Sequence, residues 1–122
     1  MSDSTYSPTT RKDVVFLGGR IKSPPFSLQA RLEAGHLLER LQRGEDLSLP
    51  HSRPLPSLGP RCHELRVNDE NVTWRIIHRV DPEAILVGDV FPKKTRTIPK
   101  RILEACRRRF ALHDERMRKA RR

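Results

Sequence analysis

A chain of 122 residues with 35% hydrophobic content has room for a single domain with one core, which excludes a large enzyme with a deep pocket. No apolar stretch approaches the ~20 residues that cross a bilayer, and the polar start lacks the layout of a signal peptide, so a cytoplasmic protein without membrane contact is expected. The net charge of +10 resides in residues 93–122, which hold thirteen basic and three acidic residues, whereas residues 1–92 hold twelve of each.

This concentrated positive charge has two interpretations. A strongly cationic segment favours a polyanion, most often nucleic acid, because each neutralised phosphate releases condensed counterions. The alternative is a solvated basic helix that keeps the protein in solution. Charge alone does not separate the two.

The N-terminal third predicts a tail, a strand and a helix. Residues 1–11 read as a disordered tail, and residues 13–17 form a β-branched and apolar run that predicts a first strand. Ser27 is a candidate N-cap for the helix, and Gly44 is a candidate residue just past its end. Apolar residues recur at helical spacing between them: Leu28, Ala30, Leu32, Ala34, Leu37, Leu38 and Leu41.

The middle of the chain predicts a long loop followed by three strands. Residues 45–60 contain four prolines and read as an extended loop, too rich in proline for a helix or a central strand. Residues 62–67, 72–80 and 84–91 then predict an antiparallel meander, with the continuous apolar run of 84–91 as its most buried strand.

A last helix is predicted from about Pro99, with an apolar stripe at Ile102, Leu103, Cys106 and Phe110. The predicted fold class is α+β, with an antiparallel sheet, an N-terminal helix or helical hairpin and a C-terminal helix. Residues 12–113 form the single predicted domain, residues 114–122 are a basic C-terminal extension, and Arg116 to Arg122 are expected to fray.

Cationic residues on the predicted strands form the candidate site. Arg66 ends the first meander strand, Arg75 lies in the second, and Lys93 and Lys94 follow the third. Adjacent strands lie ~4.8 Å apart, so side chains on one face come within reach of one another. Arginine offers a planar fork to phosphate oxygens and lysine a point charge, which suits a phosphodiester. The alternative is that Arg66 and Arg75 form ordinary ion pairs with carboxylates such as Glu64.

RNA carries its own nucleophile, the 2′-hydroxyl, so cleavage needs only activation of that group, charge stabilisation at phosphorus and protonation of the leaving oxygen. His78 is a possible proton shuttle, although simple alternation places it opposite Arg75. No metal-ligand spacing and no cofactor motif is present, and the two cysteines, 44 residues apart, are expected as buried thiols or one disulfide.

Five short motifs follow one order along the chain, and together they resemble a known family. They are Leu41-Gln42-Arg43-Gly44-Glu45-Asp46, Pro54-Leu55-Pro56-Ser57-Leu58-Gly59-Pro60, Glu64-Leu65-Arg66-Val67, Trp74-Arg75-Ile76-Ile77 and Phe91-Pro92-Lys93-Lys94-Thr95-Arg96-Thr97. Residues 13–112 thereby resemble the phage-related HigB-type branch of the RelE/ParE toxin superfamily of type II toxin–antitoxin systems.

The resemblance implies a RelE-like fold and an endonuclease that cuts mRNA without a metal, usually at the ribosomal A site. It also implies a helix-turn-helix antitoxin of the HigA type, possibly in a hetero-oligomer with the toxin. Its catalytic positions fall on Arg66, Arg75, Lys93 and Lys94. Further basic side chains are predicted RNA contacts: Arg79, Arg96, Lys100, Arg101, Arg107 and Arg108.

The chain departs from the family pattern at three positions. His78 stands where relatives often carry tyrosine, Asp89 where they often carry histidine, and Pro92 replaces a common polar residue. Two other functions stay open: a ParE-like gyrase inhibitor without nuclease chemistry, because the shared fold does not fix the function, and a catalytically inactive module that binds nucleic acid, which the departures at His78 and Asp89 would permit.

Overall fold

The structure is a computed structural model that describes residues 11–18, 25–94 and 96–121. The first ten residues of the predicted tail lie outside the described residues. The elements are β1 (Asp13–Phe16), α1 (Leu28–Gln42), β2 (Ser52–Pro54), β3 (Cys62–Asn68), β4 (Thr73–Val80), β5 (Ala84–Pro92) and α2 (Lys100–Ala120). The predicted α+β class is confirmed.

The five strands form one sheet in the order β1-β5-β4-β3-β2. The predicted antiparallel meander of β3, β4 and β5 is present, but β1 pairs with β5 in parallel, so the sheet is mixed rather than antiparallel. The segment between β1 and β5 contains α1 and three strands, which is long enough to return the chain in the same direction.

Strand β2 falls inside the segment whose proline content predicts a loop. It is three residues long, lies at the edge of the sheet beside β3, and ends on Pro54. An edge strand tolerates proline because one side of its backbone has no ladder partner. The proline content therefore excludes a central strand correctly but does not exclude this short edge strand.

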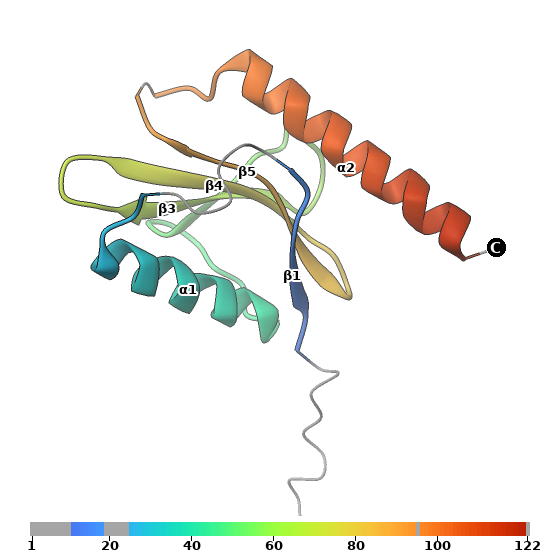
Figure 1. The fold of residues 1–122 in the computed structure, drawn as a ribbon, viewed down its shortest axis with the longest axis horizontal. Coiled ribbons are helices and arrows are strands. Elements are labelled where there is room, and N and C mark those ends of the chain that lie inside the picture. The colour runs from blue at the N-terminus through green and yellow to red at the C-terminus, as the bar shows by residue number, and fades with distance from the viewer. Residues whose placement is uncertain (1–10, 19–24, 95, 122) are drawn as a thin grey trace, which may run out of the picture.

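The two helices pack on opposite sides of the sheet (Figure 1). On one side, Ala30, Ala34, Leu37 and Leu41 of α1 lie in a cluster with sheet residues such as Trp74. On the other side, Ile102, Cys106 and Phe110 of α2 lie in a second cluster with sheet residues that include Cys62, Ile77 and Leu86. Alternation along the strands, with one register shift in the β4–β5 pairing, separates the two sets, so each face of the sheet has its own core.

The ends of α1 confirm the predicted caps. The Ser27 hydroxyl accepts a hydrogen bond from the Ala30 amide at 3.1 Å, and Gly44, just past the C-cap, adopts a φ of 91°, which glycine tolerates best. The Ser27 amide donates to the Asp69 carboxylate at 2.9 Å, and hydrogen bonds from Ser27 lower the pKa of Asp69 to about 2. Leu28, a member of the predicted apolar set of this helix, is 69% exposed.

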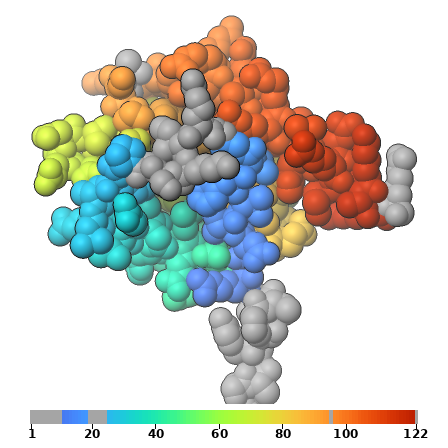
Figure 2. Space-filling view, viewed as in Figure 1, coloured from blue at the N-terminus to red at the C-terminus, as the bar shows by residue number. Residues whose placement is uncertain are grey.

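Helix α2 continues through Ala120, so residues 116–120, which are expected to fray, are helical; Arg122 lies outside the described residues. The C-terminal end of α2 lies at the edge of the molecule in Figure 2, while Asp114 in the same half of the helix still contacts Arg79 of the sheet. The two cysteines are free and buried, as one of the two alternatives predicted. Neither helix among the described residues is long and apolar enough to cross a membrane.

Candidate nucleic-acid interface

The register of β2, β3 and β4 brings three arginines and one glutamate together on the sheet face that also carries α2. Arg66 pairs directly with Arg75 across β3 and β4, and Arg53 of β2 pairs with Glu64 of β3. Residues two apart on a strand share a face, so Glu64 joins Arg66. We call Arg53, Glu64, Arg66 and Arg75 the arginine cluster.

Glu64 lies at the centre of the arginine cluster and is fully buried. One of its carboxylate oxygens is 2.9 Å from Nε of Arg75. The other is 3.4 Å from a terminal nitrogen of Arg53 and 3.7 Å from Nε of Arg66. The predicted alternative of sheet-face ion pairs is therefore realised. One carboxylate faces three guanidinium groups, however, so the cluster keeps a surplus of two positive charges.

The three arginines differ in accessibility. Arg75 is completely buried, and its guanidinium also donates to the carbonyl of Arg96 at 3.1 Å, which ties the loop after β5 to the sheet. Burial lowers the pKa of Arg75, and Glu64 opposes this effect. The side chains of Arg66 and Arg53 are 27% and 40% exposed. The accessible part of the surplus charge thus lies on Arg66 and Arg53.

A cavity of about 190 Å³ opens beside Arg75, between β5 and the start of α2. Lys94, Thr97 and Arg101 line it together with Arg75, and Phe91 is one of its apolar walls. Two predicted site residues, Arg75 and Lys94, are thus brought together at one cavity. Two predicted RNA contacts also reach this region, because Arg101 lines the cavity and Arg96 supplies the carbonyl that Arg75 binds.

Lys93 does not line this cavity. It is half-buried, and its backbone amide donates to the carbonyl of Thr73 at 2.6 Å, which continues the β4–β5 pairing. Asp89 stands where relatives often carry histidine. Its Oδ2 lies 3.6 Å from a terminal guanidinium nitrogen of Arg109, and its ion pair is therefore with this arginine rather than with Lys93 or Lys94. Its carboxylate therefore pairs with α2.

Arg79 is a predicted RNA contact, but in the structure carboxylates of the protein itself bind its side chain. Its guanidinium makes two 2.8 Å hydrogen bonds to Asp81 and two more to Asp114 of α2, at 3.0 and 2.6 Å. These carboxylates raise its pKa further above the usual arginine range. The guanidinium also lies over the Phe110 ring, 5.3 Å from its centroid. Arg79 therefore fastens α2 to the sheet.

The remaining predicted contacts lie on or near α2 and are exposed, in agreement with a cationic outer surface: Arg96, Lys100, Arg101, Arg107 and Arg108. Arg107 also donates to the carbonyl of Ser57 at 3.0 Å, which links α2 to the proline-rich segment. These positions remain predictions as RNA contacts.

His78 lies on the face of the sheet opposite Arg75, on the side of α1. The sheet separates it from the arginine cluster, so it cannot shuttle protons there. Its side chain is fully buried, and its Nδ1 is 3.2 Å from the carbonyl of Ile76. Because a carbonyl can only accept, Nδ1 carries the hydrogen. Burial lowers the pKa of His78 to about 4.

We expect this histidine to make the protein sensitive to mild acid. Between pH 6.5 and about 4, His78 is charged in the unfolded chain and neutral in the folded one, so the unfolded state binds the extra proton. The free energy of unfolding should therefore fall by on the order of 2–3 kcal/mol as the pH drops through this window. Urea titrations at several pH values measure the free energy of unfolding, and His78→Gln should reduce its dependence on pH in this window. An equally steep dependence in that variant would assign the effect to other titratable groups.

Arg53 is the site residue that the sequence does not reveal. It lies on the short strand within the proline-rich segment, where no alternation predicts a strand. The sequence prediction contains Glu64 as a residue on the same face as Arg66 and Arg75 and as their competing ion-pair partner. Among the described residues, no three His, Cys, Asp or Glu side chains are grouped so that they could hold a metal ion.

Comparison with protein families gives a match that spans most of this fold. The profile of the phage-derived Gp49-like proteins (DUF891) matches residues 25–111, from the start of α1 into α2. The chain belongs to the Gp49-like family. This family is RelE/toxin-like and is associated with the toxins of toxin–antitoxin systems, which implies an antitoxin partner for this Gp49-like protein. Comparison with curated proteins and with solved structures gave no significant match.

The matched region of the Gp49-like protein contains the whole arginine cluster and the cavity beside Arg75. It leaves out β1 and the C-terminal end of α2. The candidate interface therefore lies within the part of the chain that defines the family, whereas the basic end of α2 lies outside it.

Proposed function

We propose that this Gp49-like protein is a HigB-type toxin that cleaves mRNA without a metal ion. The observation that carries the proposal is the arginine cluster, with its surplus of two positive charges, next to a cavity that Lys94 and Arg101 line. Such a surplus in a partly dehydrated site favours a phosphodiester, since cations aimed at developing negative charge stabilise it more strongly than in water.

In the proposed reaction, the 2′-hydroxyl of RNA attacks the adjacent phosphorus, and the bond from phosphorus to the 5′ oxygen breaks. The 2′-hydroxyl proton leaves to a base, and the departing 5′ oxygen takes up a proton. Arg66 and Arg53 are the accessible cations for the charge that develops on the phosphate oxygens. In this proposal Lys94, which lines the cavity beside Arg75, donates a hydrogen bond or a proton to the RNA. Arg75, being buried, positions Glu64 and the loop carbonyl of Arg96.

The proposed partners are those that a positively charged surface attracts. A ribosome-bound message supplies the RNA strand, and the exposed basic face of α2 is the proposed contact with ribosomal RNA. A helix-turn-helix antitoxin of the HigA type is the proposed inhibitor. Acidic residues of that antitoxin would neutralise the basic surface of α2, either by covering it or by moving the helix.

The test is cleavage of message in a translation extract, with 5′ ends mapped. Wild-type protein should generate new 5′ ends, and the double change Arg66→Ala with Lys94→Ala should lower the cleavage rate about a hundredfold or more, because each removed cation takes away charge stabilisation. The matched control is Arg31→Ala with Arg43→Ala, which removes two positive charges from α1 and its C-cap on the other side of the sheet.

Cleavage that survives the Arg66/Lys94 change would remove the site assignment. Intact message with bound RNA and a steep salt dependence would instead identify a binding module without nuclease activity. DNA double-strand damage with intact message would identify a gyrase inhibitor.

A further inference from the structure

The two edges of the sheet differ in how well they are protected against pairing with another strand. At one edge, β2 ends on Pro54, which has no amide hydrogen to donate. At the other edge lies β1 (Figure 1), which is hardly longer but contains no proline and pairs with β5 without a register shift. Prolines and bulges are devices that keep strands of other chains from adding to a sheet. The edge at β1 has neither.

The hydrogen bonds of β1 show which of its backbone groups face away from the sheet. Successive residues of a strand direct their amide and carbonyl groups to opposite sides. The Leu17 amide, one residue past the end of β1, donates to the Val87 carbonyl of β5 at 2.9 Å, so the backbone of Leu17 faces the sheet. By alternation, the amide and carbonyl groups of Val14 and Phe16 face outward.

These outward groups form an open row. The start of the strand is closed, because the Lys12 amide donates to the Gln42 carbonyl at 2.9 Å and the Gln42 side chain donates to the Lys12 carbonyl at 2.7 Å. Within the described part of the chain, no hydrogen bond closes the outward groups of Val14 and Phe16 in this way. Such a row along an extended strand is a template on which another strand pairs.

An exposed aromatic ring lies at the same edge. Phe16 is 56% exposed, and residues of β1, blue in Figure 2, reach the surface of the molecule. By alternation the ring lies on the same face as Val14, which packs against the core cluster of α1. A strand added beside β1 would cover part of this ring as well as satisfy the open backbone groups.

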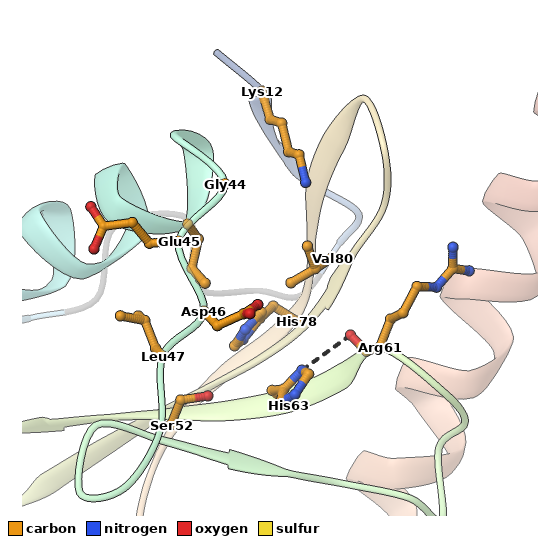
Figure 3. Close-up of a pocket in the computed structure, with 11 residues that line it drawn as sticks. Lys12, Gly44, Glu45, Asp46, Leu47, Ser52, Arg61, His63, His78 and Val80 are labelled. Atoms are coloured by element: carbon orange, nitrogen blue, oxygen red, sulfur yellow. Dashed lines mark hydrogen bonds between the residues drawn. The ribbon is translucent and has the colours of Figure 1, made fainter. Parts of the chain in front are cut away.

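The charge of the chain decides which kind of strand this edge attracts. With a net charge of +10, the chain repels a second copy and attracts an acidic partner. Lys12 extends its side chain over the cavity at the end of α1 (Figure 3), and Arg109, which also pairs with Asp89, lies next to Gly18 beyond the end of β1. The strand itself has one carboxylate, Asp13. An acidic and apolar segment therefore suits this edge best.

We propose that the outer edge of β1 accepts an extended, acidic and apolar segment of the antitoxin as an additional strand of the sheet. The antitoxin is the partner that membership of the Gp49-like family implies, and the inference rests on that part of the proposed function. The added strand pairs with the backbone of Val14 and Phe16 and covers the Phe16 ring. Because the arginine cluster lies on β2, β3 and β4, this contact holds the antitoxin away from the proposed RNA site.

The experiment is amide hydrogen exchange of the full chain, followed by NMR, with a synthetic heptapeptide that alternates valine and glutamate. Saturating peptide should slow exchange of the Val14 and Phe16 amides at least tenfold, because new hydrogen bonds form there. The Leu17 amide, which already pairs with β5, should change less. A peptide that alternates valine and lysine should bind at least tenfold more weakly. Unchanged exchange at millimolar valine–glutamate peptide, or protection along β2 instead, would overturn the proposal.

Two variants locate the contact. Val14→Pro removes an outward amide but no hydrogen bond to β5, which an edge strand tolerates, and it should abolish the protection of the Phe16 amide. Phe16→Ala removes the exposed ring and should weaken peptide binding at least tenfold. Its matched control is Leu32→Ala, a 64% exposed position on α1 that should leave the affinity unchanged. Unchanged affinity in Phe16→Ala would contradict the proposed contact even if Val14→Pro does not fold.

Two further readouts separate this inference from its alternatives. A dimer in sedimentation, with the Val14 and Phe16 amides protected in the absence of peptide, would identify a second copy as the occupant and overturn the proposal. Cleavage of message tests the proposed nuclease separately, and Phe16→Ala should keep the wild-type rate. Peptide protection without any cleavage would contradict the nuclease alone, whereas cleavage without peptide protection would contradict strand addition alone.

Discussion

Glu64→Gln is expected to lower the free energy of unfolding by about 3–5 kcal/mol, because it removes the carboxylate that three guanidinium groups share. The glutamine keeps the shape of the side chain, so the loss reports charge. Arg75 is the main reason for the size of the effect: it is completely buried, so water cannot solvate its charge once the 2.9 Å ion pair is lost.

Urea denaturation measures this loss, and Glu70→Gln is the matched control. Glu70 lies in the exposed turn between β3 and β4, so its substitution should change the free energy of unfolding by no more than about 0.5 kcal/mol. Replacing both buried partners, with Glu64→Leu and Arg75→Met, should recover most of the lost stability, since a buried ion pair can be exchanged for apolar packing. A change below about 1 kcal/mol in Glu64→Gln would show that water reaches the cluster.

Phe110→Ala is expected to cost about 3–5 kcal/mol, the usual loss for truncating a buried aromatic ring. Phe110 is 4% exposed and packs where β5 has Gly88. An ideal Cβ placed on Gly88 would lie only 3.1 Å from the Phe110 ring, so the ring fills the space that the glycine leaves. The Arg79 guanidinium lies over the same ring, so truncation removes that contact as well.

Leu112→Ala is the control for this change. It lies two residues further along α2 with 47% exposure, and we expect it to lose well under about 1 kcal/mol. Circular dichroism should show that both variants retain the helix. Similar losses at the two positions would mean that α2 is weakly held and that its packing contributes little to stability.

The elements that can be predicted are those with a strong local signal. Ser27 and Gly44 delimit α1 through side-chain and backbone chemistry that a few neighbouring residues determine. The three meander strands are predicted within one or two residues, because β-branched and apolar runs between turns need no distant information. The parallel pairing of β1 with β5 depends on the path of the intervening chain, which no local pattern contains.

The site is predictable only in part, for a similar reason. Alternation along β3 and β4 correctly places Arg66, Arg75 and Glu64 on one face. It cannot show that Arg75 is buried, because burial depends on how the loop after β5 and the start of α2 cover the sheet. The sequence assigns Arg79 to RNA because its partner Asp114 lies 35 residues away, and only the packing of α2 brings the two together.

The position of the two cysteines has a practical consequence. Cys62 of β3 and Cys106 of α2 both lie in the apolar layer beneath α2, and burial raises the pKa of each thiol, that of Cys106 to about 12. Because the thiolate is the reactive form, alkylating reagents should reach these sulfurs only when the helix lifts from the sheet. The labelling rate is therefore an intrinsic reporter of helix detachment. An inhibitor that displaces α2 would accelerate labelling, whereas one that only coats its outer face would not.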